Sequence, residues 1–295
     1  MSDFDAIVLG GGPAGVELAQ VVQRLGGEVV LVEHADRVIP REPAALGQAL
    51  AEALKRDGIE LRLGVLATEA LRDGEDYVVR LSDGTEVRGE RLLIATGRRP
   101  RVEGIGLETV GVEADPHGVR VDEYLRAGER LWAIGDVNGI WPLTHVGEYE
   151  GDVVVANIAG EDHPANYEAV PRVTYTDPQA AAVGATEARY SATTQLSDVP
   201  KTATYTHAYA KLNGFLTLLS DGSRLTGAYA LGEAGEWLQQ ATLAIRVRVP
   251  LEVLGDIQPF PSFSGIFDST LKALRMHVAS MPPPARPMQV QMARP

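Results

Sequence analysis

Residues 6–15 read AIVLGGGPAG, an apolar strand that runs into a glycine-rich turn at the start of a helix. The glycines permit a tight turn, and the backbone N–H groups at the helix start can face a pyrophosphate. A second apolar run, VVLVE at residues 29–33, ends in Glu33, where a carboxylate can accept both hydroxyls of a ribose. This combination predicts the phosphate cradle of a dinucleotide-binding βαβ unit. The alternative is a turn of the same shape with no ligand.

An unpartnered acid at position 33 favours NAD over NADP, because sites for a 2′-phosphate usually supply an arginine there. His34 and Arg37 lie close by in the sequence and soften this preference.

The composition sets limits on the class of protein. The chain has 295 residues, a net charge of -13 and no cysteine. The negative charge gives no attraction to nucleic acid or to anionic lipid, and no apolar run reaches the length of a membrane span. Without cysteine there is no disulfide, thiolate metal site or redox-active cysteine pair, and the six histidines show no metal-ligand spacing. We expect a cytoplasmic protein without metal.

Hydrophobic periodicity predicts alternating strands and helices in the first half of the chain. The order βαβαβ, followed by a hairpin and further strands, predicts a parallel sheet with a β-meander. Strands are expected at 4–9, 28–33, 59–63, 77–81, 85–88, 92–95 and 131–134, and helices at 13–26, 43–57 and 146–158.

The composition changes near residue 163, and antiparallel strands followed by helices predict an α+β second domain. Strands are expected at 172–175, 215–219 and 225–230, and helices at 233–247 and 264–278. The predicted division is therefore a Rossmann-like domain over residues 1–162, a second domain over 163–280 and a disordered tail over 281–295.

The chain resembles the FAD-dependent pyridine nucleotide-disulfide oxidoreductases, such as dihydrolipoamide dehydrogenase and mercuric reductase, in several motifs that occur in the family's order. These lie at residues 10–19, 38–42, 95–100, 134–137 and 170–178. The resemblance implies an α/β Rossmann-like dinucleotide-binding domain, a C-terminal α+β dimerisation domain, a homodimer, and FAD and NAD as cofactors.

The resemblance also implies roles for single residues. Asp136 would bind the ribityl chain of FAD, and His145 would lie near the flavin ring. Glu17 resembles a family glutamate close to flavin and nicotinamide, or else it is a carboxylate favoured by the helix N-terminus. The expected cofactor-binding residues are Gly10, Gly12, Pro13, Ala14, Gly15, Glu33, Gly97, Gly135, Asp136 and His145.

Three departures from the family argue against disulfide chemistry. One Rossmann unit is visible where the family has two, and the redox cysteine pair is absent. Gln258 and Gly265 stand where the family places a His–Glu pair, and neither can donate or orient a proton. We therefore assign no catalytic residue, and we interpret the chain as two glycine-rich repeats joined by an internal deletion.

The nucleotide and the activity remain open at this level. We expect the strand before Asp136 to lie beside the strand at 4–9, which favours FAD, whereas the turn and Glu33 fit the ADP half of either dinucleotide. The favoured function is hydride transfer between NADH and flavin, with a small-molecule acceptor and no disulfide relay. The alternatives are a catalytically inactive homodimeric nucleotide-binding remnant and a cofactor-independent lyase or isomerase.

Overall fold

A computed structural model of the chain describes residues 3–199, 214–255, 262 and 264–281. Contacts between Cα atoms divide the chain into two compact units, residues 1–95 with 171–295, and residues 96–170. The division at residue 162 expected from the sequence stays a prediction. Apart from Met281, the expected disordered tail lies outside the described residues.

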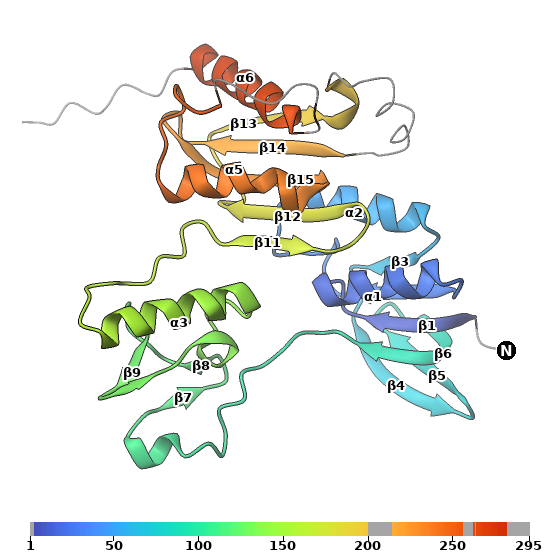
Figure 1. Cartoon of the computed structure of the whole chain (residues 1–295). Coiled ribbons are helices and arrows are strands. Elements are labelled where there is room, and N and C mark those ends of the chain that lie inside the picture. The colour runs from blue at the N-terminus through green and yellow to red at the C-terminus, as the bar shows by residue number, and fades with distance from the viewer. Residues whose placement is uncertain (1–2, 200–213, 256–261, 263, 282–295) are drawn as a thin grey trace, which may run out of the picture. The chain divides into compact units, whose positions relative to one another are not determined.

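The first unit contains a six-stranded sheet in the order β3-β2-β1-β6-β5-β4 (Figure 1). Strands β3, β2, β1 and β6 run parallel, and the hairpins β6–β5 and β5–β4 add two antiparallel strands. The strands span Phe4–Leu9 (β1), Val29–Glu33 (β2), Glu60–Leu63 (β3), Ala67–Asp73 (β4), Asp76–Leu81 (β5) and Glu86–Ile94 (β6). The predicted parallel sheet with a meander is confirmed.

The parallel part of the sheet is apolar on both faces. Along β1, Ala6 and Val8 join one buried cluster, while Ile7 and Leu9 join another on the opposite face. A strand covered on both sides lacks the alternation of polar and apolar residues, which explains the continuous apolar run read in the sequence.

Strand β6 changes its type of pairing along its length. Val87 pairs with the antiparallel β5, whereas Leu92, Leu93 and Ile94 pair with the parallel β1. The sequence pattern predicts two separate strands here, at 85–88 and 92–95, the second of them buried. That was wrong, because one strand covers residues 86–94 and Ile94 is 67% exposed at its end.

Helices α1 (Pro13–Arg24) and α2 (Ala44–Arg56) pack on one face of this sheet. Their buried residues recur at helical spacing, Val16 and Ala19 on α1 and Leu46, Leu50 and Leu54 on α2. In the part of the chain that the structure describes, no helix is both long and apolar enough to cross a membrane.

The other sheet of this unit is antiparallel, in the order β11-β12-β15-β14-β13. Helix α5 packs on β12 and β15, and α6 packs on β13 and β14 (Figure 1), as expected for an α+β domain. The elements span Pro171–Thr174 (β11), Gln179–Gly184 (β12), Tyr190–Gln195 (β13), Phe215–Ser220 (β14), Leu225–Gly232 (β15), Ala234–Arg246 (α5) and Gly265–Ser280 (α6).

One face of α1 is fastened to the turn between β11 and β12. The Glu17 carboxylate accepts the backbone N–H of Tyr175 at 2.7 Å. Gln20 donates to the Asp177 carbonyl at 2.9 Å and accepts the Asp177 N–H at 2.8 Å. Arg24 donates to the carboxylates of Asp57, at 3.0 Å, and Asp177, at 2.6 Å. We call these three side chains of α1 the α1 clamp.

The second unit, residues 96–170, has short elements around a small apolar core of Val112, Val119 and Ala133. Its two-stranded sheets pair β7 with β8 and β9 with β10. The elements span Leu107–Val110 (η1), Ala114–Asp115 (β7), Gly118–Val119 (β8), Arg126–Gly128 (β9), Leu131–Trp132 (β10), Gly135–Asn138 (η2) and Thr144–Ile158 (α3).

The strand before Asp136 does not pair with β1, so the expected adjacency in one sheet was wrong. Strand β10 is two residues long and pairs with β9, whereas the neighbours of β1 are β2 and β6. Strand β2 pairs with one edge of β1, and the apolar end of β6 pairs with the other edge. The position of β10 therefore gives no support for FAD over NAD.

The α1 clamp predicts a large effect of Gln20→Leu on stability. The Gln20 side chain is 5% exposed, and leucine would leave the N–H and carbonyl groups of Asp177 without these partners. We expect a loss of about 2–4 kcal/mol in the free energy of unfolding, measured by urea denaturation. The control Gln48→Leu replaces an exposed glutamine on α2 and should change it by less than about 0.5 kcal/mol. Equal losses in both variants would contradict the clamp.

Candidate dinucleotide-binding site

The glycine-rich turn between β1 and α1 has a different requirement at each glycine. Gly10 has φ 109°, a conformation that a residue with a side chain rarely adopts. A Cβ atom on Gly15 would lie 1.9 Å from the carbonyl oxygen of Gly10, so the helix can approach the strand only with glycine there. A Cβ on Gly12 would meet no atom within 4 Å. The chain's own packing therefore requires Gly10 and Gly15, and leaves the side of Gly12 open.

The turn delivers the N-terminus of α1 to this open side. Gly12 is the N-cap and Pro13 the first helical residue, with no capping side chain and no acid in the first turn. Pro13 and Ala14 are exposed. The backbone N–H groups of the first turn and the positive end of the helix dipole make this a place for an anionic group.

Glu33 lies directly beside the turn, at the end of β2. Its side chain is 5% exposed, and its carboxylate accepts the N–H of Gly11 at 2.5 Å and the N–H of Ala35 at 2.8 Å. The Nδ1 atom of His34 lies 2.7 Å from the same carboxylate. A carboxylate has about four acceptor positions, so these contacts leave capacity for a ribose hydroxyl. The predicted proximity of Glu33 and the glycine-rich turn is observed.

The remaining predicted residues lie in the second unit. Asp136 is in η2, and its side chain is 58% exposed. Its carboxylate lies 4.0 Å from the guanidinium of the exposed Arg98, which follows Gly97. The start of this unit therefore lies close to η2, and Gly97 adopts a φ of 129°.

Helix α3 starts two residues earlier than predicted, at Thr144, and the exposed His145 lies in its first turn. A Cβ on Gly147 would lie 3.4 Å from the Cα of Gly135, so this end of α3 packs closely against η2. His145 is thus on the helix end that packs beside Asp136's turn.

Sequence reasoning missed Glu150, which is completely buried and hydrogen-bonded to Gly135 of η2. A signal was present in the helix pattern. The buried face of α3 carries Val146, Glu150 and Val153, so an acid stands in the middle of an apolar stripe. A charged residue at such a position needs partners in the interior.

Two further positions singled out in the sequence concern the C-terminal region. Gln258 lies outside the described residues. Gly265 is the first residue of α6. The interpretation that these two replace a proton-donating pair stays a prediction.

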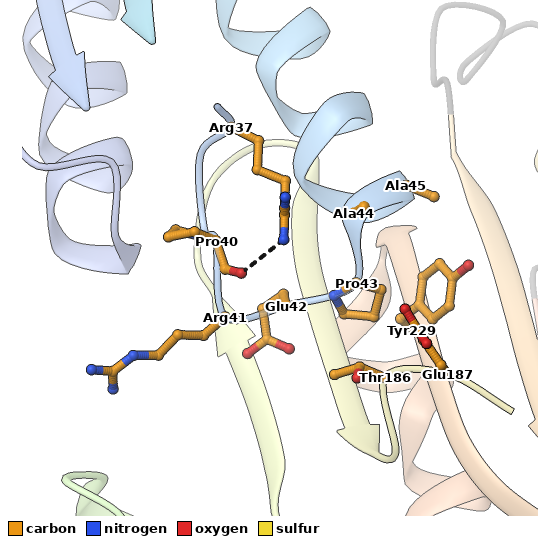
Figure 2. Close-up of a pocket in the computed structure, with 10 residues that line it drawn as sticks. All are labelled: Arg37, Pro40, Arg41, Glu42, Pro43, Ala44, Ala45, Thr186, Glu187 and Tyr229. Carbon is orange, nitrogen blue, oxygen red and sulfur yellow. Dashed lines mark hydrogen bonds between the residues drawn. The ribbon is translucent and has the colours of Figure 1, made fainter. Parts of the chain in front are cut away.

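A hollow of about 340 Å³ lies in the first unit beside the start of α2 (Figure 2). Its wall includes Arg37, which donates to the carbonyl oxygen of Pro40 at 3.2 Å, and Tyr229 of β15. None of the predicted cofactor-binding residues lines it. In the described ranges, no three histidine, aspartate or glutamate side chains gather as metal ligands.

Comparison with known proteins identifies the family. The sequence model of the pyridine nucleotide-disulphide oxidoreductases matches residues 3–151, and that of the family's dimerisation domain matches residues 170–270. The chain belongs to the pyridine nucleotide-disulphide oxidoreductase family. It is 35% identical to the dihydrolipoyl dehydrogenase of Thermus scotoductus over 278 residues, which cover 88% of this chain and 59% of that enzyme. It is 35% identical to the mercuric reductase of Shigella flexneri over 272 residues, which cover 86% of this chain and 47% of that enzyme.

Solved structures show the same fold. LpdA of Mycobacterium tuberculosis matches with a TM-score of 0.80 and 26% identity, over 92% of this chain and 62% of that one. The flavoprotein disulfide reductase RclA of Escherichia coli matches with a TM-score of 0.81 and 22% identity, over 91% and 65%. The chain thus spans about half to two thirds of the length of these relatives.

The geometry of the turn predicts a large loss of stability for one alanine substitution and a small change for another. Gly15→Ala places a Cβ on the Gly10 carbonyl and should lower the free energy of unfolding by about 1–3 kcal/mol or more. Gly12→Ala meets open space in an extended backbone conformation and should change it by less than about 1 kcal/mol. Thermal and urea unfolding of both variants test this. Comparable losses of stability would contradict the conclusion that packing requires glycine at position 15 but not at position 12.

Proposed function

We propose that this chain binds a dinucleotide at the glycine-rich turn and acts as an oxidoreductase unit that transfers hydride between NADH and FAD without a disulfide relay. The observation that carries the proposal is the contrast within the turn, where Gly10 and Gly15 are required by the fold and Gly12 borders open space. A glycine that the protein's own packing does not need fits the close approach of a pyrophosphate to the backbone.

Each residue of the turn would have a definite task. The N–H groups at the start of α1 would hold the pyrophosphate, and Glu33 would accept a ribose hydroxyl from its fixed position beside Gly11. The buried carboxylate of Glu33 disfavours a 2′-phosphate through like charge, which supports NADH over NADPH.

The second unit supplies residues that suit a flavin. The exposed carboxylate of Asp136 can accept hydroxyl donors of a ribityl chain, and Gly97, Gly135 and His145 would line the same place. When bound, nicotinamide and flavin supply the redox chemistry, and the protein positions them and excludes water. Because the chain has no cysteine, the electrons would pass to a small-molecule acceptor rather than to a cysteine pair.

We further propose that the chain forms a homodimer through residues 170–270, which match the family's dimerisation domain. Sedimentation or light scattering at micromolar concentration tests this. A monomer at these concentrations would contradict it.

One observation favours a second candidate, a nucleotide-binding protein without turnover. The chain covers 59% of the length of the dihydrolipoyl dehydrogenase of Thermus scotoductus, and its 295 residues include no cysteine. Both candidates require nucleotide affinity, and turnover alone separates them.

An absorption spectrum of the purified protein, before and after addition of FAD and then NADH, tests the function. A flavin band that stays with the protein through gel filtration and is bleached by NADH is the expected result. A retained band without bleaching favours the inactive candidate. No retained flavin after reconstitution, with no NADH binding by calorimetry, would overturn both.

Substitution of Gly12 tests whether the pyrophosphate of the dinucleotide lies against the glycine-rich turn. Gly12→Ala should weaken binding of ADP, the part that both cofactors share, by about tenfold or more, because the methyl group fills the space for the pyrophosphate. The matched control is Gly151→Ala in α3, whose Cβ makes only an ordinary contact 3.9 Å from Ile134. Isothermal titration calorimetry measures both, and unchanged affinity in Gly12→Ala would place the nucleotide elsewhere.

A further inference from the structure

Glu150 is a completely buried acid in the second unit, and all of its recorded partners are donors. Its Oε2 atom accepts the backbone N–H of Gly135 at 2.6 Å and the Nδ2 amide of Asn138 at 2.9 Å. Its Oε1 atom accepts the hydroxyl of Tyr167 at 2.7 Å. This pattern suits an ionised carboxylate, because such a group only accepts hydrogen bonds.

The donors belong to segments on two sides of α3. Gly135 and Asn138 are the first and last residues of η2, whereas Tyr167 comes from the segment after the helix. Burial, followed by the hydrogen bond to Glu150, raises the pKa of the Tyr167 hydroxyl. A tyrosine hydroxyl keeps its proton at neutral pH even with its ordinary pKa, and the raised pKa keeps it a donor to the carboxylate at more alkaline pH as well.

Asn138 extends the same network along the backbone. Its amide also donates to the Ala133 carbonyl at 3.3 Å, and its side-chain oxygen accepts the N–H of Ile140 at 2.9 Å. The backbone from residue 133 to residue 140 is thus held around a single buried acid. Removing that acid would take an acceptor from the Gly135 N–H and from the Asn138 amide, and the loss of these hydrogen bonds would lower the stability of the turn.

Asp136 lies between the two residues that Glu150 holds. Gly135 directly precedes Asp136 and has φ 72°. The side chain of Asp136 is 58% exposed, and its carboxylate lies 4.0 Å from the Arg98 guanidinium. The backbone of the turn is therefore fixed from the interior, and the carboxylate of Asp136 is directed outward.

We propose that Glu150 is a positioning residue, which fixes η2 through Gly135 and Asn138 so that Asp136 presents its carboxylate to a polyhydroxyl ligand. This assignment rests on the proposed function in one respect, namely that the ligand of Asp136 is the ribityl chain of FAD. Glu150 itself touches no ligand, since it is buried beneath the turn. Its effect on binding passes through the conformation of residues 135–138.

The experiment has two readouts, of which the first needs no ligand. Amide hydrogen exchange of the peptide over residues 133–140 reports how firmly η2 is held. We expect about tenfold faster exchange in Glu150→Ala and a smaller increase in Glu150→Gln, because the glutamine oxygen can still accept from Gly135 and Asn138. The control Glu148→Gln changes an exposed acid on the same helix and should leave the exchange unchanged.

The second readout is the affinity for FAD, followed by flavin fluorescence, in a double-mutant cycle with Asp136→Ala. Asp136→Ala should weaken binding without changing exchange at η2. Glu150→Gln should weaken binding about fivefold in the wild-type background, and should add little in the Asp136→Ala background, because both act through one contact. Equal effects of Glu150→Gln in both backgrounds would mean a general structural role and would overturn the proposal.

The outcomes separate this proposal from the proposed function. If wild-type protein binds no FAD, the flavin assignment fails, and hydrogen exchange still decides whether Glu150 fixes the turn. If FAD binds and exchange at residues 133–140 is unchanged in Glu150→Gln and Glu150→Ala, the positioning role is wrong while the flavin site stands. Thermal unfolding of each variant shows whether Glu150→Ala folds, and Glu150→Gln carries the test if it does not.

Discussion

The α1 clamp is the constraint on which the first unit depends. Helix α1 carries the glycine-rich turn at its N-terminus, and its clamp residues Glu17, Gln20 and Arg24 bind the backbone or side chains of residues 175–177. These positions recur at helical spacing, so one face of the helix reaches the antiparallel sheet while the face with Val16 and Ala19 reaches the parallel sheet. The orientation of the glycine-rich turn is therefore set by both sheets together.

Two buried carboxylates perform the same physical task in the two units. Glu33 accepts the N–H of Gly11, and Glu150 accepts the N–H of Gly135. Glycine-rich turns gain little from side-chain packing, so a charge-assisted hydrogen bond from a rigid strand or helix replaces it. Each turn keeps a defined shape although it exposes backbone on its other side.

The sequence predicted the fold well where local pattern decides it. The elements from β1 to β3 and the helices α1 and α2 agree within a few residues, because apolar periodicity and glycine stops act locally. The pairing partner of β10 was predicted wrongly, since pairing is a long-range choice and β6 satisfies the edge of β1. Glu33 was found from its motif. The hydrogen bond from the Tyr175 N–H to Glu17 was not, because a bond between distant segments leaves no spacing in the sequence. Glu150 was missed although it interrupts the apolar face of α3, because that pattern does not show which groups it binds.

The single strand β6 has a consequence for how this chain can vary in length. One continuous backbone serves the antiparallel hairpin with β5 and the parallel edge of β1. An inserted or deleted residue within Glu86–Ile94 would turn the following side chains to the other face of the sheet. It would also change the position of the chain that leaves β6 and leads to Gly97. A change in length at the exposed hairpin loop, residues 82–84, would leave both pairings in register. Insertions during the divergence of such chains should therefore accumulate in that loop and be absent from the strand.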